Sequence, residues 1–289
     1  DQPSKQADAA PDSAPEREAR GYELTTNAEY LGFQSVEVTA QDESKPWKPA
    51  TEVKVTKADG TVVEGLDANT QFFTFKDASG YELTVSAAAA GHIDDLHIKG
   101  KDAGSKFDEP SLEALFRDAA AKLPGGIAEA PGVSAFSVEM GKTMGQEGIA
   151  GMNELLQDGT LESDDVMTAQ GVRHEVSALN RSGDLDAKRA FVGRFAVEHP
   201  NCKVRFEIIR GTVVVPVVGA PKRPTSKLFM VFGPDATGER KTLYTIAPGR
   251  NMPRHPNPDQ HKNKEGVLDE ATFEESQKAW FDTVMLKGA

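Results

Sequence analysis

The sequence has a single cysteine and no long apolar run, and each shortage excludes a class of protein. Cys202 is the only cysteine among 289 residues, so no disulfide within the chain can stabilise the fold. The longest apolar run, residues 213–220, has eight residues including a proline, whereas a membrane-spanning helix needs about 20. We therefore expect no membrane span. One cysteine slightly favours a reducing compartment such as the cytoplasm, but an exported protein fits the same count, so the localisation stays open.

Large apolar residues are also missing from the start of the chain. Residues 1–20 contain three prolines and no aromatic or large aliphatic side chain, so they cannot bury enough apolar area to offset the entropy of ordering. We predict a disordered leader or linker there. Over the whole chain, 38% hydrophobic and 27% charged residues are typical of a globular protein, which excludes collagen, coiled coil and wholesale disorder.

Residues 21–104 carry the alternating pattern of half-buried strands. The dipeptide Asp59-Gly60 lies between two alternating segments, and both of its residues tolerate the positive φ of a hairpin turn. The same arrangement recurs around residues 77–80, and we expect a further strand over residues 95–99. This part of the chain is predicted to be a small antiparallel β domain.

The period of the apolar pattern changes twice in the remainder. Helical spacing dominates residues 105–200, which predicts a helical segment. Alternation returns in residues 201–289, where we expect a four-stranded antiparallel sheet followed by a final helix. The predicted fold class is therefore α+β, with a C-terminal basic α+β domain packed on the central helices.

Charge is distributed unevenly along the chain. The net charge is −12, yet residues 201–264 contain twelve basic and four acidic side chains, a net charge of +8. Residues 1–200 have a net charge of −16. Such asymmetry favours RNA or another polyanion as partner of the basic part, and a protein partner for the acidic part. The alternative is that the two parts pack against each other or are solvated.

The basic side chains gather around the last predicted strand and the loop that follows it. Lysine and arginine neutralise phosphates, and a histidine near its reference pKa of about 6.5 can act as general acid or base on a phosphodiester. We assign His255 a catalytic role and Arg254 the stabilisation of charge on the phosphorane. Tyr244 is a candidate for stacking on a base. The cations that we assign to substrate binding are Lys241, Arg250 and Lys262.

A metal site is the alternative use of the same loop. His255, Asp259 and His261 lie within seven residues, and such ligands suit zinc or another transition metal. No second cluster supplies a fourth ligand at an obvious spacing. A metal-dependent hydrolase using His255 and His261 is therefore kept as an alternative, while our main hypothesis assigns no metal and no cofactor.

Residues 184–254 resemble a known family of toxins in their order of elements. A helix or two precedes an antiparallel sheet that contains Lys227-Leu-Phe-Met-Val-Phe-Gly233 and Leu243-Tyr-Thr-Ile-Ala-Pro-Gly249 and ends in a basic, histidine-bearing loop. This order is similar to the barnase–EndoU–colicin–RelE superfamily of ribonuclease toxins. Members often place a histidine on the early helices and a basic or hydroxyl residue on the sheet. The resemblance therefore implies that His174 and Thr245 join His255 in catalysis, with Arg173 at the substrate.

Three functional hypotheses follow. The first is a metal-independent ribonuclease-like domain, a toxin or processing nuclease, that acts on RNA through the basic C-terminal sheet. The second is a non-enzymatic protein-binding or structural module. The third is the metal-dependent hydrolase that uses His255 and His261.

Overall fold

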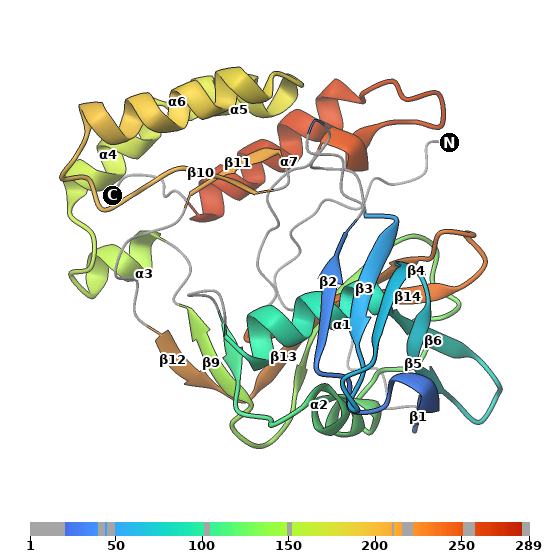
Figure 1. Ribbon diagram of the computed structural model, residues 1–289. Coiled ribbons are helices and arrows are strands. Elements are labelled where there is room, and N and C mark those ends of the chain that lie inside the picture. The colour runs from blue at the N-terminus through green and yellow to red at the C-terminus, as the bar shows by residue number, and fades with distance from the viewer. Residues whose placement is uncertain are drawn as a thin grey trace, which may run out of the picture.

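The computed structural model describes residues 21–39, 44, 50–100, 105–148, 152–209, 211–215, 222–250 and 258–284. These residues form two units (Figure 1). Each unit has its own hydrophobic cluster. The sheet unit comprises the described residues of 21–148 and 222–250, and the helical unit comprises those of 152–215 and 258–284. The predicted α+β class is confirmed. The predicted leader over residues 1–20 lies outside the described residues.

A six-stranded mixed sheet organises the sheet unit. Its strands, in spatial order, are β1 (Glu23–Thr26), β5 (Gln71–Lys76), β6 (Glu82–Ser86), β14 (Lys241–Pro248), β13 (Lys227–Pro234) and β8 (Ser134–Glu139). Neighbouring strands are antiparallel except β6 and β14, which run parallel. The predicted hairpin around residues 77–80 is confirmed, and β13 pairs with β14 antiparallel, as expected for C-terminal strands.

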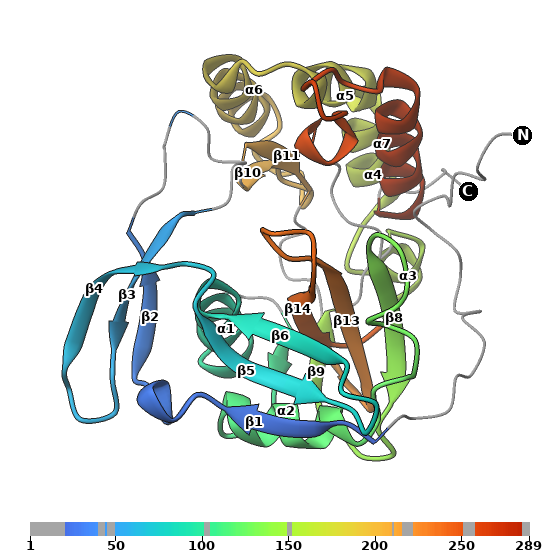
Figure 2. The same ribbon diagram turned by 90° about the vertical axis from the view of Figure 1, so that its right-hand side faces the viewer.

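One face of this sheet buries aromatic and aliphatic side chains against helices α1 (Ala87–Ile93) and α2 (Leu112–Ala120). The rings of Phe73 and Phe75 on β5 meet the ring of Phe116 on α2 edge-on, with centroids 4.9 and 5.7 Å apart. Figure 2 shows both helices behind the sheet. The alternation seen in the sequence therefore supplies the core of this unit, because every second side chain of β5 points at α2.

Two small sheets flank the large one. One contains β2 (Ser35–Val38), β3 (Glu52–Thr56) and β4 (Val62–Asp67), with the predicted turn at Asp59-Gly60; the other contains β7 (Lys106–Phe107), β9 (Gly145–Gly148) and β12 (Lys222–Thr225). Helix α1 approaches β2 so closely at Gly91 that a Cβ there would lie 2.7 Å from the Cβ of Val36. Glycine is therefore needed at this crossing.

The prediction of a strand over residues 95–99 is wrong. Residues 94–98 form a π-helical turn that continues directly from α1. The Ser86 hydroxyl accepts a hydrogen bond from the Ala89 amide and begins the helix, and four alanines follow. The short alternation around Leu96 is too weak to outweigh a capped helix that has already begun.

The helical unit packs five helices around a two-stranded hairpin. The helices are α3 (Met152–Gln157), α4 (Ser163–Gly171), α5 (Arg173–Arg181), α6 (Leu185–Glu198) and α7 (Glu270–Val284), and the strands are β10 (Glu207–Ile209) and β11 (Thr212–Val214). Aromatic rings of α6 pack against Phe206 just before the hairpin, with centroids 5.1 Å away for Phe191 and 4.7 Å for Phe195. None of the helices in the described ranges is both long and apolar enough to cross a bilayer.

The strands of the large sheet come from all three predicted domains. Strands β1, β5 and β6 lie in residues 21–104, β8 lies in residues 105–200, and β13 and β14 lie in residues 201–289. In the described part of the C-terminal region, β10 pairs with β11 apart from this sheet, and β12 pairs with β9. Two antiparallel pairs of the strands expected there form, β10 with β11 and β13 with β14, but they lie in two different sheets.

Candidate functional site

The residues assigned to RNA cleavage lie on both units. Arg173 and His174 begin helix α5 of the helical unit. Lys262 lies before α7 in the sequence and forms an isolated β-bridge with Leu268. Lys241, Tyr244 and Thr245 are on β14 of the sheet unit, and Arg250 follows that strand. Helix α5 packs against α7 and β11, whereas β14 packs between β6 and β13. The two groups thus belong to different hydrophobic clusters. Arg254 and His255 lie outside the described residues.

Tyr244 has a structural role on β14. Its ring lies against Gly233 of the neighbouring strand, where any larger side chain would collide with the ring. Its hydroxyl donates a hydrogen bond of 2.7 Å to the Pro234 carbonyl oxygen. The pairing of β14 with β13 shifts register next to Tyr244, and Thr245 lies opposite Val231. An aromatic ring held over a strand glycine stabilises the pair of strands. Tyr244 is nevertheless 39% exposed, so its stacking on a base stays a prediction.

Arg250 belongs to an ion-pair cluster, which we define as Glu147, Glu154, Arg223 and Arg250. The Glu147 carboxylate lies 3.0 Å from Arg223 Nε and accepts a hydrogen bond of 3.1 Å from the Arg250 backbone amide. The Arg250 guanidinium lies 3.5 Å from the carboxylate of Glu154 on α3. A side chain at Gly249 would collide with the Glu147 carboxylate, so glycine is needed beside it. The cluster is electrically neutral, and it links β9, β12 and the end of β14 to the helical unit.

Arg240 and Lys241 have different surroundings. The Arg240 guanidinium is exposed and lies 3.6 Å from the Glu82 carboxylate on β6. Lys241 is only 8% exposed, and its ammonium donates a hydrogen bond to the Gly132 carbonyl oxygen. Burial lowers the pKa of Lys241. A buried ammonium is costly unless an acceptor or an anion compensates it, so Lys241 is the most unusual of the predicted binding residues.

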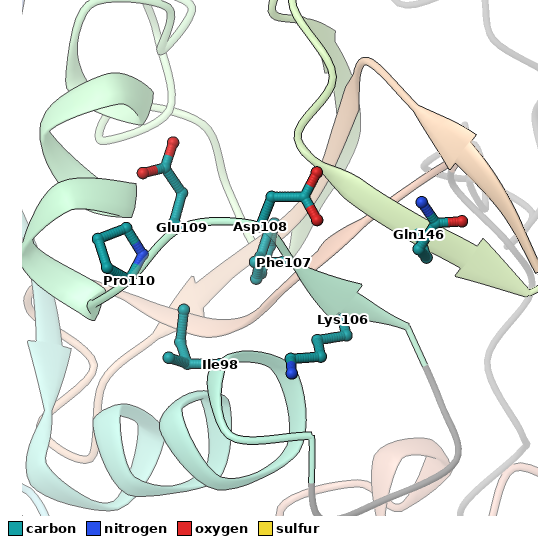
Figure 3. Close-up of a pocket in the computed structure, with 7 residues that line it drawn as sticks. All are labelled: Ile98, Lys106, Phe107, Asp108, Glu109, Pro110 and Gln146. Atoms are coloured by element: carbon teal, nitrogen blue, oxygen red, sulfur yellow. The ribbon is translucent and has the colours of Figure 1, made fainter.

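Hollows between the described residues open on the sheet unit, and two of them bear on the site. The larger, about 380 Å³, lies between the π-helical turn and β7 and includes Ile98, Lys106, Phe107 and Glu109 in its wall (Figure 3). The smaller, about 210 Å³, lies beside the turn that joins β13 and β14 and is lined by Arg240 and Lys241. The predicted basic region therefore has a hollow at Lys241, and sequence reasoning gave no sign of the larger cavity.

A carboxyl pair lies next to the larger cavity. Lys142 Nζ lies 3.3 Å from Glu109 and 2.7 Å from Asp118 on α2. A hydrogen bond with Asp118 raises the pKa of Glu109, and burial adds to this effect. Hydrogen bonds with Glu109 and Lys142 lower the pKa of Asp118. The trio fastens the loop before α2 to the loop between β8 and β9. It could not be found from spacing, because Lys142 is 33 residues from Glu109.

Metal binding finds no support among the described residues. No group of three or more histidine, cysteine, aspartate or glutamate side chains there is placed to hold a metal ion. His261 ends a short 3-10 helix, and its ring lies 5.5 Å from that of Phe273 on α7. His255, the other ligand of the metal hypothesis, lies outside the described residues, so that hypothesis stays a prediction.

Comparison of the chain with protein families, with curated proteins and with solved structures gives no significant match.

Proposed function

We propose that this chain is a non-enzymatic binding module in which Arg223, Arg240 and Arg250 serve internal ion pairs rather than RNA. The observation that supports this most is the ion-pair cluster, in which Arg250 already has two carboxylate partners, Glu147 and Glu154. Arg240 is likewise paired with Glu82. Binding of a polyanion is driven by cations that release phosphate counterions, and a cation neutralised within the protein contributes less to that release.

The partner that suits this module is a protein with a basic surface. Residues 1–200 have a net charge of −16, and only part of that charge is needed to balance the C-terminal cations. Complementary potentials speed association and favour partners of opposite sign. Poly-lysine is therefore a suitable probe, and we expect binding that weakens as salt is added.

Substitution of Arg250 separates the two main hypotheses. Under our proposal, Arg250→Met leaves Glu147 and Glu154 with Arg223 as their only cation in the cluster and lowers the free energy of unfolding by roughly 0.2–1 kcal/mol for each pair that is lost. If Arg250 instead binds an RNA phosphate, Arg250→Met reduces the slope of log affinity against log salt concentration by about one. Urea unfolding and fluorescence anisotropy with single-stranded RNA at several salt concentrations measure the two effects. Lys264→Met, which removes an exposed cation from the same region, is the matched control.

Measurements of RNA affinity and of stability on the wild type and both variants test the proposal. We expect little RNA binding by the wild type at physiological salt and no effect of Lys264→Met on stability. Tight RNA binding whose salt dependence falls in both variants, with stability unchanged, would overturn the proposal.

The ribonuclease hypothesis stays a prediction, because Arg254 and His255 lie outside the described residues. Its own test is cleavage of RNA by the wild type in EDTA. Under that hypothesis, cleavage disappears in His255→Ala or His174→Ala. Under our proposal, the wild type does not cleave.

A further inference from the structure

The smaller cavity is formed by two turns that are far apart in the sequence. One wall comes from residues 128–132 before β8, and the other from the β13–β14 turn with Pro234 and Gly238. Its volume is about 210 Å³. A single oxyanion with some water fits this space.

Lys241 supplies an uncompensated charge at the wall of this cavity. Its side chain is buried, and its one acceptor in the described part of the chain is the Gly132 carbonyl oxygen. An ammonium has three N–H donors, so two remain without an acceptor. No carboxylate among the described residues forms an ion pair with it, and burial alone accounts for the lowered pKa of Lys241. A bound anion would compensate the charge and accept these hydrogen bonds.

Arg240 adds a second cation at the rim. Its side chain is 55% exposed, and the contact with Glu82, at 3.6 Å from Nη1, leaves most of its five donors available. Glu239 also lines the cavity, but it is exposed, so water and salt screen its charge. The planar guanidinium suits a phosphate or carboxylate, and the lysine supplies a point charge.

We propose that the cavity beside Lys241 binds a small oxyanion, a phosphate or a carboxylate, through the Lys241 ammonium and the Arg240 guanidinium. This site is independent of the proposed function, because it needs neither a protein partner nor RNA. It also gives Lys241 a role that differs from the contact with an RNA backbone expected from the sequence.

Titration calorimetry with inorganic phosphate and with acetate, at constant ionic strength maintained with sodium chloride, tests the site. We expect saturable binding to the wild type. Loss of a charge-assisted hydrogen bond weakens affinity about tenfold or more, which is the effect expected for Lys241→Met. Arg240→Ala, on an exposed side chain, keeps the test decisive if Lys241→Met does not fold.

A second buried lysine provides the control. Lys188 also donates to a backbone carbonyl, that of Gly211, but it lines neither of the two cavities. Lys188→Met should therefore bind phosphate as the wild type does. Tighter binding of phosphate than of acetate identifies a phosphate site, and the reverse identifies a carboxylate site. The proposal is overturned if the wild type shows no saturable binding, or if Lys241→Met and Arg240→Ala both bind as the wild type does.

Discussion

Lys188 places a charge inside the core of the helical unit. It is 2% exposed, and its ammonium lies 2.6 Å from the Gly211 carbonyl oxygen. Burial lowers its pKa, and the Asp184 charge opposes this only in part. Desolvation of an ammonium costs several kcal/mol, more than the roughly 1–3 kcal/mol for leaving one carbonyl unsatisfied. We therefore predict that Lys188→Met raises the free energy of unfolding by about 1–2 kcal/mol at neutral pH.

The pH dependence of this effect has a definite sign. Because the folded pKa of Lys188 lies below the unfolded value of about 10.4, the unfolded chain binds more protons between the two values. Wild-type stability therefore rises with pH in that window, and the advantage of Lys188→Met shrinks. Urea unfolding between neutral and alkaline pH measures both curves. A constant difference between them would contradict the prediction. Burial also lowers the pKa of Lys241, but Lys241 is present in both proteins and so does not change the difference between their curves.

Single residues also show how far the sequence could predict the candidate site. The density of basic residues singled out Lys241 and Arg250, and both have unusual surroundings. Their partners could not be predicted, because Gly132 is 109 residues from Lys241 and Glu147 is 103 residues from Arg250. No local spacing contains such information. The sequence therefore indicated where cations concentrate, but not which of them are neutralised.

Asn180 connects two elements in the helical unit. Its side chain is fully buried on α5, donates a hydrogen bond of 3.2 Å to the Val213 carbonyl and accepts one of 2.7 Å from the Val213 amide. The Asn180 side chain thus supplies hydrogen-bond partners for the backbone N–H and C=O groups at the outer edge of β11, as a neighbouring strand would. We predict that Asn180→Leu lowers the free energy of unfolding by about 2–4 kcal/mol, because both backbone groups lose their partners.

Asn180→Asp is the matched control for this prediction. At neutral pH its carboxylate still accepts from Val213 but faces the Val213 carbonyl without a donor. Protonation at acidic pH restores the donor, so the deficit relative to wild type should shrink as pH falls. Urea unfolding and hydrogen exchange of the Val213 amide give the readouts. Wild-type protection of that amide in Asn180→Leu would contradict the proposed pairing.

At the same scale, elements defined by local chemistry were predicted well. The hairpin at Asp59-Gly60 forms because its turn residues and flanking strands agree, and Gly60 adopts the positive φ of 86° that the turn requires. The stretch at residues 95–99 was mistaken because the cap at Ser86 lies nine residues upstream of the alternation. An element is thus predictable when its own residues decide its conformation.

The arrangement of the whole molecule depends on pairings that no local pattern contains. Strands β6 and β14 run side by side although Thr84 and Thr242 are 158 residues apart. Most residues of the helical unit lie between these strands in the sequence. A prediction made segment by segment therefore assigns the two strands to separate domains, although they share one sheet. The period of the apolar pattern predicted the α+β class, because the class depends only on which elements form, whereas strand order is a property of tertiary packing.

Contact between the two units includes the ion pairs of Glu154 on α3. Its carboxylate lies 3.5 Å from Arg250 and 3.9 Å from Arg223, both of the sheet unit. These side chains are about one-third exposed, and such pairs contribute roughly 0.2–1 kcal/mol each. We predict that Glu154→Gln loosens the units, with a larger radius of gyration in small-angle scattering and a coupling energy with Arg250→Met of about 0.5–1 kcal/mol.

Salt provides the decisive comparison for the Glu154 prediction. At 1 M salt the screening length falls to about 3 Å, so the wild type should approach the scattering of Glu154→Gln. Asp186→Asn is the control, because Asp186 pairs with Arg189 within α6, at 3.4 Å, and does not bridge the units. If Glu154→Gln and Asp186→Asn scatter alike at low salt, the units are held together by other contacts, and the ion-pair cluster serves only the local packing of β9 and β12.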